Sequence, residues 1–86
     1  MWITNWQRML PVVNATRGLI PAALTKSVRD SVDKPLPLAD IERAFSRGDP
    51  ALVRGAVFDL LRTGGLAAPT LRTEPLSLGS VVEPVR

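Results

Sequence analysis

Apolar side chains recur at spacings of three and four residues near the amino terminus, the pattern of one helix face. Trp2, Trp6, Met9 and Leu10 form this face. A proline inside a helix removes a backbone hydrogen bond, so we expect this helix to end at Pro11. Residues 1–13 are therefore predicted to form a helical flap on the body of the protein, with a docking surface for a partner as the alternative.

The next apolar series has a spacing of four residues and predicts a core helix. Its members are Ile20, Leu24, Val28 and Val32. Proline is tolerated in the first turn of a helix, so Pro21 places the start at about residue 19 or 20, and we expect the end near Ser31. Two prolines within 33–37 then favour an extended linker.

Two further helices are predicted in close succession, as in a helix-turn-helix. A stripe of Leu38, Ile41, Ala44 and Phe45 defines the first, which is expected to end at Arg47 and Gly48. Asp49 is the predicted N-cap, and Pro50 the first residue, of a second helix that runs to Thr63. The side chains that this second helix is expected to bury are Leu52, Val53, Ala56, Val57, Leu60 and Leu61.

The remaining face of the helix 50–63 is expected to be open to a partner. It combines small residues, guanidinium groups and an aromatic ring, and consists of Ala51, Arg54, Gly55, Phe58 and Arg62. Gly64 and Gly65 are expected to supply a left-handed C-cap. Beyond them, prolines exclude helix, and we predict a β-hairpin with strands at 66–72 and 76–82 and a turn at 73–75.

The expected fold class is therefore mainly α with a C-terminal β-hairpin. A chain of 86 residues is expected to form one domain, here a helical flap (1–13) followed by a compact module (14–86). The stretch 1–13 lacks the unbroken apolar run of a signal peptide, and no apolar run reaches the roughly 20 residues that cross a bilayer. We expect a cytoplasmic protein that does not enter membranes.

The sequence contains neither cysteine nor histidine, which excludes thiol nucleophiles, imidazole bases and the usual zinc ligands. Its carboxylates form no spaced set typical of a nuclease or glycosidase, and no glycine-rich phosphate loop is present. We therefore expect no enzyme activity, no catalytic residues, no metal site, no cofactor and no small-molecule substrate.

Eleven basic residues against eight acidic ones give a net charge of +3. This balance favours polyanionic partners only slightly, and an ordinary charged surface is the alternative. Arginine outnumbers lysine, and the guanidinium group suits phosphates and guanine edges.

The stretches "LPLADIERAF", "RGDPALVRGAVFDLLRTGGL" and "LSLGSVVEPV" resemble the second helix, the third helix with its exit, and the returning wing strand of the winged-helix family. The resemblance covers Leu36 to Val85, and a generic helical domain with a hairpin is the alternative. In DNA-binding members of this family the third helix enters the major groove and the wing touches the backbone.

The resemblance implies a DNA-binding module in which Arg54, Gly55, Phe58 and Arg62 face the groove, while Arg43, Arg47 and Arg72 meet phosphates. Glu74 at the expected wing tip departs from this pattern, because a phosphate contact prefers Lys or Arg.

The order of elements also resembles the small helical C-terminal domains of the end-cleaving subunits of Tn7-type transposases, which implies a role in transposition or in a phage complex. The alternative function is a protein–protein interaction and assembly module. Its anchors would be Trp2, Trp6 and Phe58, since aromatic residues are favoured at interface hot spots.

Overall fold

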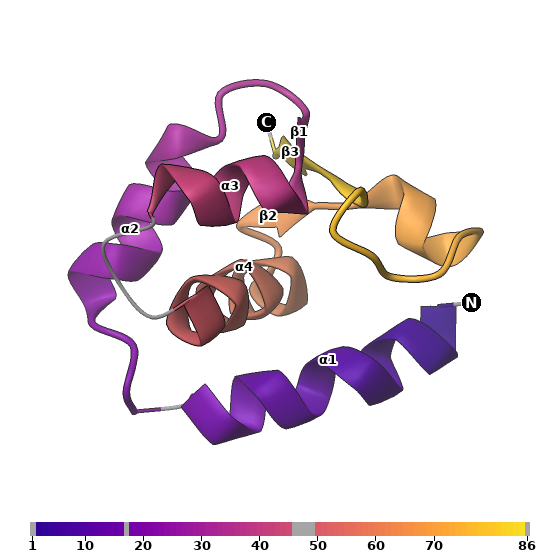
Figure 1. Ribbon diagram of the computed structural model, residues 1–86, viewed down its shortest axis with the longest axis horizontal. Coiled ribbons are helices and arrows are strands. Elements are labelled where there is room, and N and C mark those ends of the chain that lie inside the picture. Colours follow the sequence, from indigo (N-terminus) through magenta and orange to yellow (C-terminus); the bar gives the residue numbers. More distant parts are fainter. Residues whose placement is uncertain (1, 17, 46–49, 86) are drawn as a thin grey trace.

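Helices make up most of the computed structural model, which describes residues 2–16, 18–45 and 50–85. The α-helices are α1 (Trp2–Thr16), α2 (Ala22–Ser31), α3 (Leu38–Ala44) and α4 (Pro50–Thr63), and η1 (Pro69–Arg72) is a 3₁₀ helix. Strands β1 (Leu36–Pro37), β2 (Leu66–Ala67) and β3 (Val81–Pro84) form an antiparallel sheet in the order β1-β3-β2. The prediction of a mainly helical chain is confirmed (Figure 1).

Helix α4 lies at the centre of the fold and contacts α1, α2, α3 and β2 (Figure 1). Its predicted bounds are confirmed. Val53, Ala56, Val57 and Leu60 are buried as predicted, and Leu52 and Leu61 are half-buried. Each large aliphatic side chain buried here stabilises the fold by roughly 1.5 to 3 kcal/mol. Gly64 ends the helix with a φ of 86°, the left-handed conformation expected of a C-cap glycine.

Helix α2 begins at Ala22, two to three residues later than predicted. A residue that precedes proline is disfavoured in the α conformation, and this excludes Ile20 from the helix. Pro21 itself has extended dihedral angles and stands just before the first turn. Val28 and Val32 are buried, so the apolar series does face the core.

The predicted extended linker contributes a strand to the sheet. In β1, Leu36 pairs with Val82 and Pro37 with Val81. The strand lies at the edge of the sheet, where a proline without an N–H group is tolerated. Helix α3 follows at once, as predicted, and its Leu38 is buried.

The predicted turn after α3 lies outside the described residues. The predicted turn consists of Arg47, Gly48 and the proposed N-cap Asp49. Within the described part, α3 ends before Phe45, whose backbone is no longer helical.

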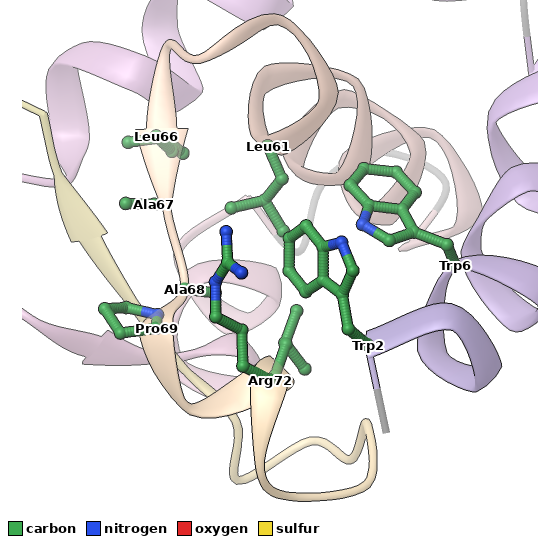
Figure 2. Close-up of a pocket in the computed structure, with 9 residues that line it drawn as sticks. Trp2, Trp6, Leu61, Leu66, Ala67, Ala68, Pro69 and Arg72 are labelled. Carbon is green, nitrogen blue, oxygen red and sulfur yellow. The ribbon is translucent and has the colours of Figure 1, made fainter.

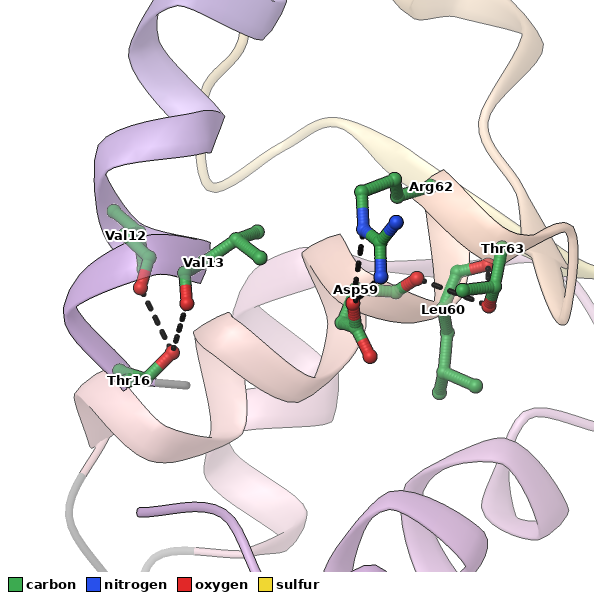
Figure 3. Close-up of polar contacts among 7 residues, drawn as sticks. All are labelled: Val12, Val13, Thr16, Asp59, Leu60, Arg62 and Thr63. Atoms are coloured by element: carbon green, nitrogen blue, oxygen red, sulfur yellow. Dashed lines mark hydrogen bonds and ion pairs between the residues drawn. The ribbon is translucent and has the colours of Figure 1, made fainter. Parts of the chain in front are cut away.

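Helix α1 does not stop at Pro11, so that prediction is wrong. The helix continues to Thr16 because Met9 and Val13, on either side of the proline, are both buried in the core. Pro11 lies on the exposed side, where water can reach the carbonyl group that loses its intrahelical partner. The Thr16 hydroxyl donates to the carbonyl oxygens of Val12 (2.8 Å) and Val13 (3.3 Å) in the last turn (Figure 3).

One buried amide side chain joins α1 to the C-terminal part of the chain. Asn5 is 1% exposed, and its Nδ2 donates to the carbonyl oxygens of Leu71 (2.7 Å) and Glu74 (2.8 Å). Its Oδ1 accepts from the backbone N–H of Leu76 (2.8 Å). Asn5 therefore binds backbone groups that have no strand partner.

The C-terminal part contains an antiparallel strand pair, but not with the predicted bounds. Strand β2 ends at Ala67, and the prediction of a strand through Arg72 is wrong because Pro69 begins the 3₁₀ helix η1. Proline favours the first position of a helical turn. The second strand is Val81–Pro84, whereas residues 76–80 form no strand, and Ala67 pairs with Glu83.

We predict that Asn5→Ala lowers the free energy of unfolding by about 2 to 4 kcal/mol, because it leaves two carbonyl groups and one N–H group without their partner. Urea denaturation measures this change. Asn14→Ala is the matched control, since Asn14 is exposed on the same helix, and it should change stability by no more than about 0.5 kcal/mol. Equal effects of the two variants would contradict a structural role of Asn5.

Candidate functional site

The face of α4 that was expected to be open is largely covered by α1. Phe58 is 1% exposed, and Gly55 is buried as well. If Gly55 had a Cβ atom, this atom would lie 3.0 Å from the Cβ of Thr16 and still closer to the Thr16 hydroxyl oxygen. Only glycine therefore lets the two helices approach this closely. The prediction that Gly55 and Phe58 face a partner is wrong, because their side of α4 is part of the core.

Arg54 is held by a carboxylate of the neighbouring helix. Its Nη2 and Nε donate to Oε1 of Glu42 at 2.9 and 3.2 Å. The Glu42 side chain is only 10% exposed, whereas that of Arg54 is 40% exposed. This ion pair connects α3 to α4 and compensates the charge that was expected to read a base.

Arg62 and Arg43 are paired within their own helices. Arg62 donates from Nη2 and Nε to Oδ1 of Asp59 at 2.8 and 3.1 Å (Figure 3). Arg43 lies 3.6 Å from Asp40. Exposed pairs of this kind contribute little stability, but each places a negative charge beside the arginine. Arg47 lies outside the described residues.

Three of the predicted DNA-contacting arginines line different cavities. Arg54 lines a cavity with Arg8 and Leu78, and Arg62 lines another with Gly18. Arg72 lines a third, and these three cavities have no residue in common.

The third cavity brings together Trp2 and Trp6, predicted to anchor a protein partner, and Arg72, predicted to meet DNA phosphates. We call this cavity the tryptophan groove; it has a volume of about 380 Å³ and lies between the start of α1 and the segment from β2 to η1 (Figure 2). Its lining residues are Trp2, Trp6, Leu61, Leu66, Ala67, Ala68, Pro69, Leu71 and Arg72.

Aromatic contacts fix the geometry of the groove. The rings of Trp2 and Trp6 meet edge to face, with their centroids 5.6 Å apart and their planes at 83°. The guanidinium carbon of Arg72 lies 4.7 Å from the centroid of the Trp2 ring, a cation–π contact. Trp2 remains 37% exposed, so it offers apolar area to a partner.

Sequence reasoning identified Trp2, Trp6 and Arg72 but missed the rest of the groove. Leu61 was expected only as a core residue of α4, and Pro69 only as part of the predicted strand 66–72. Spacing along the chain carries no signal for a contact between residues 2 and 72, so the pattern could not reveal their proximity.

The lining of the groove is mostly apolar. Arg72 is the one charged residue among its lining residues, and the rest of the lining carries only apolar side chains. Within residues 2–16, 18–45 and 50–85, no three His, Cys, Asp or Glu side chains lie close enough together to hold a metal ion. No helix in this part of the chain is both long enough and apolar enough to cross a bilayer.

Comparison with protein-family models, with curated proteins and with solved structures finds no match for this chain.

We predict that Gly55→Ala destabilises the fold by up to about 2 kcal/mol, because the added methyl group collides with Thr16. The collision costs about 1 to 3 kcal/mol. The higher helix propensity of alanine offsets about 1 kcal/mol of this cost. The Thr16→Ala/Gly55→Ala double variant should be less destabilised than the sum of the single variants, as measured by denaturant unfolding. If the destabilisation of the double variant equals the sum of the two single effects, the contact between Gly55 and Thr16 does not set the distance between α1 and α4.

Proposed function

We propose that this chain is a protein-interaction module that binds a segment of a partner protein in the tryptophan groove. The observation that carries the proposal is the position of Trp2 and Trp6, the only tryptophans of the sequence, which line one open groove. Tryptophan is among the residue types that contribute most to interface energies. Its large ring supplies apolar contact area with few rotatable bonds.

The groove is held in shape before a partner arrives. Asn5 binds the segment 71–76 to α1, and Met9 anchors the same helix in the core. The contact between Arg72 and Trp2 orients both side chains. A preformed site loses less conformational entropy on binding, which favours affinity from a small contact area.

We further propose that the part from α2 to β3 is a winged-helix-like core, with α1 as an added layer. The order α2, β1, α3, α4, β2, β3 and the sheet order β1-β3-β2 support this. In DNA-binding winged helices the outer face of the third helix enters the major groove. The corresponding face here contacts α1, which favours a protein partner over base reading by α4.

Selection of a displayed library of short random peptides on the immobilised chain tests the proposal. We expect the wild-type chain to enrich a related set of peptides, and Trp2→Ala to abolish this enrichment, because the exposed ring forms a wall of the groove. Ile3→Ala is the matched control: Ile3 is 72% exposed on the same helix but does not line the groove. Absence of any enriched peptide, or equal loss in both variants, would overturn the proposal.

Duplex DNA is a second candidate partner, favoured by the net charge of +3 and a pI of about 10.6. The proposed winged-helix-like order of elements supports it as well. Against it stand the ion pairs of Arg43, Arg54 and Arg62.

A gel-shift experiment in low salt separates the two candidates. If DNA is the partner, a complex forms, weakens steeply as salt is added because counterions are released, and is weakened further by Arg54→Ala. Since α1 covers the outer face of α4, we expect no complex at micromolar protein concentration. A complex with both the salt dependence and the Arg54 dependence would favour DNA and contradict our first proposal.

A further inference from the structure

We infer that the segment bound in the tryptophan groove carries a carboxylate beside an apolar side chain, and that Arg72 binds this carboxylate. The inference depends on the proposed protein-binding function and specifies the chemistry of the partner. It follows from the charge of Arg72, from its cation–π contact with Trp2 and from the apolar lining around them.

The positive charge of Arg72 has no negative partner in the described part of the chain. Four other arginines do form ion pairs there, each within 4.0 Å of a carboxylate; they are Arg29, Arg43, Arg54 and Arg62. Arg72 instead contacts the face of the Trp2 ring, and it is exposed at the groove. It therefore offers a cation that no carboxylate of residues 2–16, 18–45 and 50–85 neutralises.

The contact with Trp2 prepares this guanidinium for a carboxylate. A guanidinium presents its N–H donors as a planar fork. The guanidinium carbon of Arg72 lies 4.7 Å from the centroid of the Trp2 ring, and Figure 2 draws the two groups beside each other at the groove. Such a fixed fork binds a carboxylate through two parallel hydrogen bonds, and the conformational cost of ordering the side chain is already met.

The remaining wall of the groove fits an aliphatic or aromatic side chain. Trp6, Leu61, Leu66 and Leu71 line it, and no second charged residue is present. A volume of about 380 Å³ lies at the lower end of the range for ligand pockets, which suits one or two side chains of a peptide.

Single-stranded nucleic acid is the other class of ligand that stacks on tryptophan and arginine. Such binding combines stacking with a series of cations that follow the phosphate backbone. Among the described lining residues the groove has one cation, Arg72, which matches a single carboxylate and not a series of phosphates.

The test uses the peptides enriched by the full chain and compares each with its analogue in which Asn or Gln replaces the acidic residue. Tryptophan fluorescence reports binding, because both tryptophans line the groove and the sequence contains no tyrosine. We expect the enriched peptides to contain Asp or Glu next to an apolar residue. The analogue should bind at least about tenfold more weakly, the cost expected for losing a charge-assisted hydrogen bond.

Arg72→Gln should abolish the difference between each peptide and its analogue. Arg43→Gln is the matched control, because it removes the same charge from an exposed position outside the groove, and it should preserve the difference. Enriched peptides without acidic residues, or a preference for acid that survives Arg72→Gln, would overturn the inference while leaving the proposed function intact. Binding of a single-stranded oligothymidylate in preference to every peptide would overturn both.

Discussion

The close approach of α1 to α4 is the constraint on which the rest of this structure depends. It requires the absence of a side chain at Gly55, where Thr16 occupies the space that a Cβ would need. With α1 in this place, Phe58 becomes a core residue and the start of α1 reaches the segment that follows β2. The same packing that closes the outer face of α4 therefore creates the tryptophan groove at its side.

Periodicity was sufficient to predict the helices of the core. The bounds of α4 followed from Pro50 and Gly64, whose backbone preferences act locally, and its buried stripe followed from the spacing of aliphatic residues. Where long-range contacts override local preference, the predictions were wrong. Pro11 should end a helix, but burial on both sides of it stabilises the continuation by more than one backbone hydrogen bond costs.

The candidate site was less predictable than the fold. Trp2 and Arg72 were each noticed for their chemistry, yet nothing in the pattern related one to the other. Phe58 illustrates the opposite case: a helical projection locates the side of a helix on which a residue lies, but it does not reveal which other helix will cover that side. Both outcomes have the same cause, since the position of α1 is set by tertiary contacts.

The hydrogen bonds of Asn5 span 66 to 71 positions of the sequence, so the walls of the groove come from opposite ends of the described chain. Closing a loop of this length costs chain entropy before any contact rewards it, and contacts of such high sequence separation slow folding. One wall of the groove comes from residues 61–72, and the other, formed by Trp2 and Trp6, comes from the first helix. The proposed groove would then form only when folding is complete. A partly folded or locally unfolded molecule would expose its tryptophans but would lack the groove.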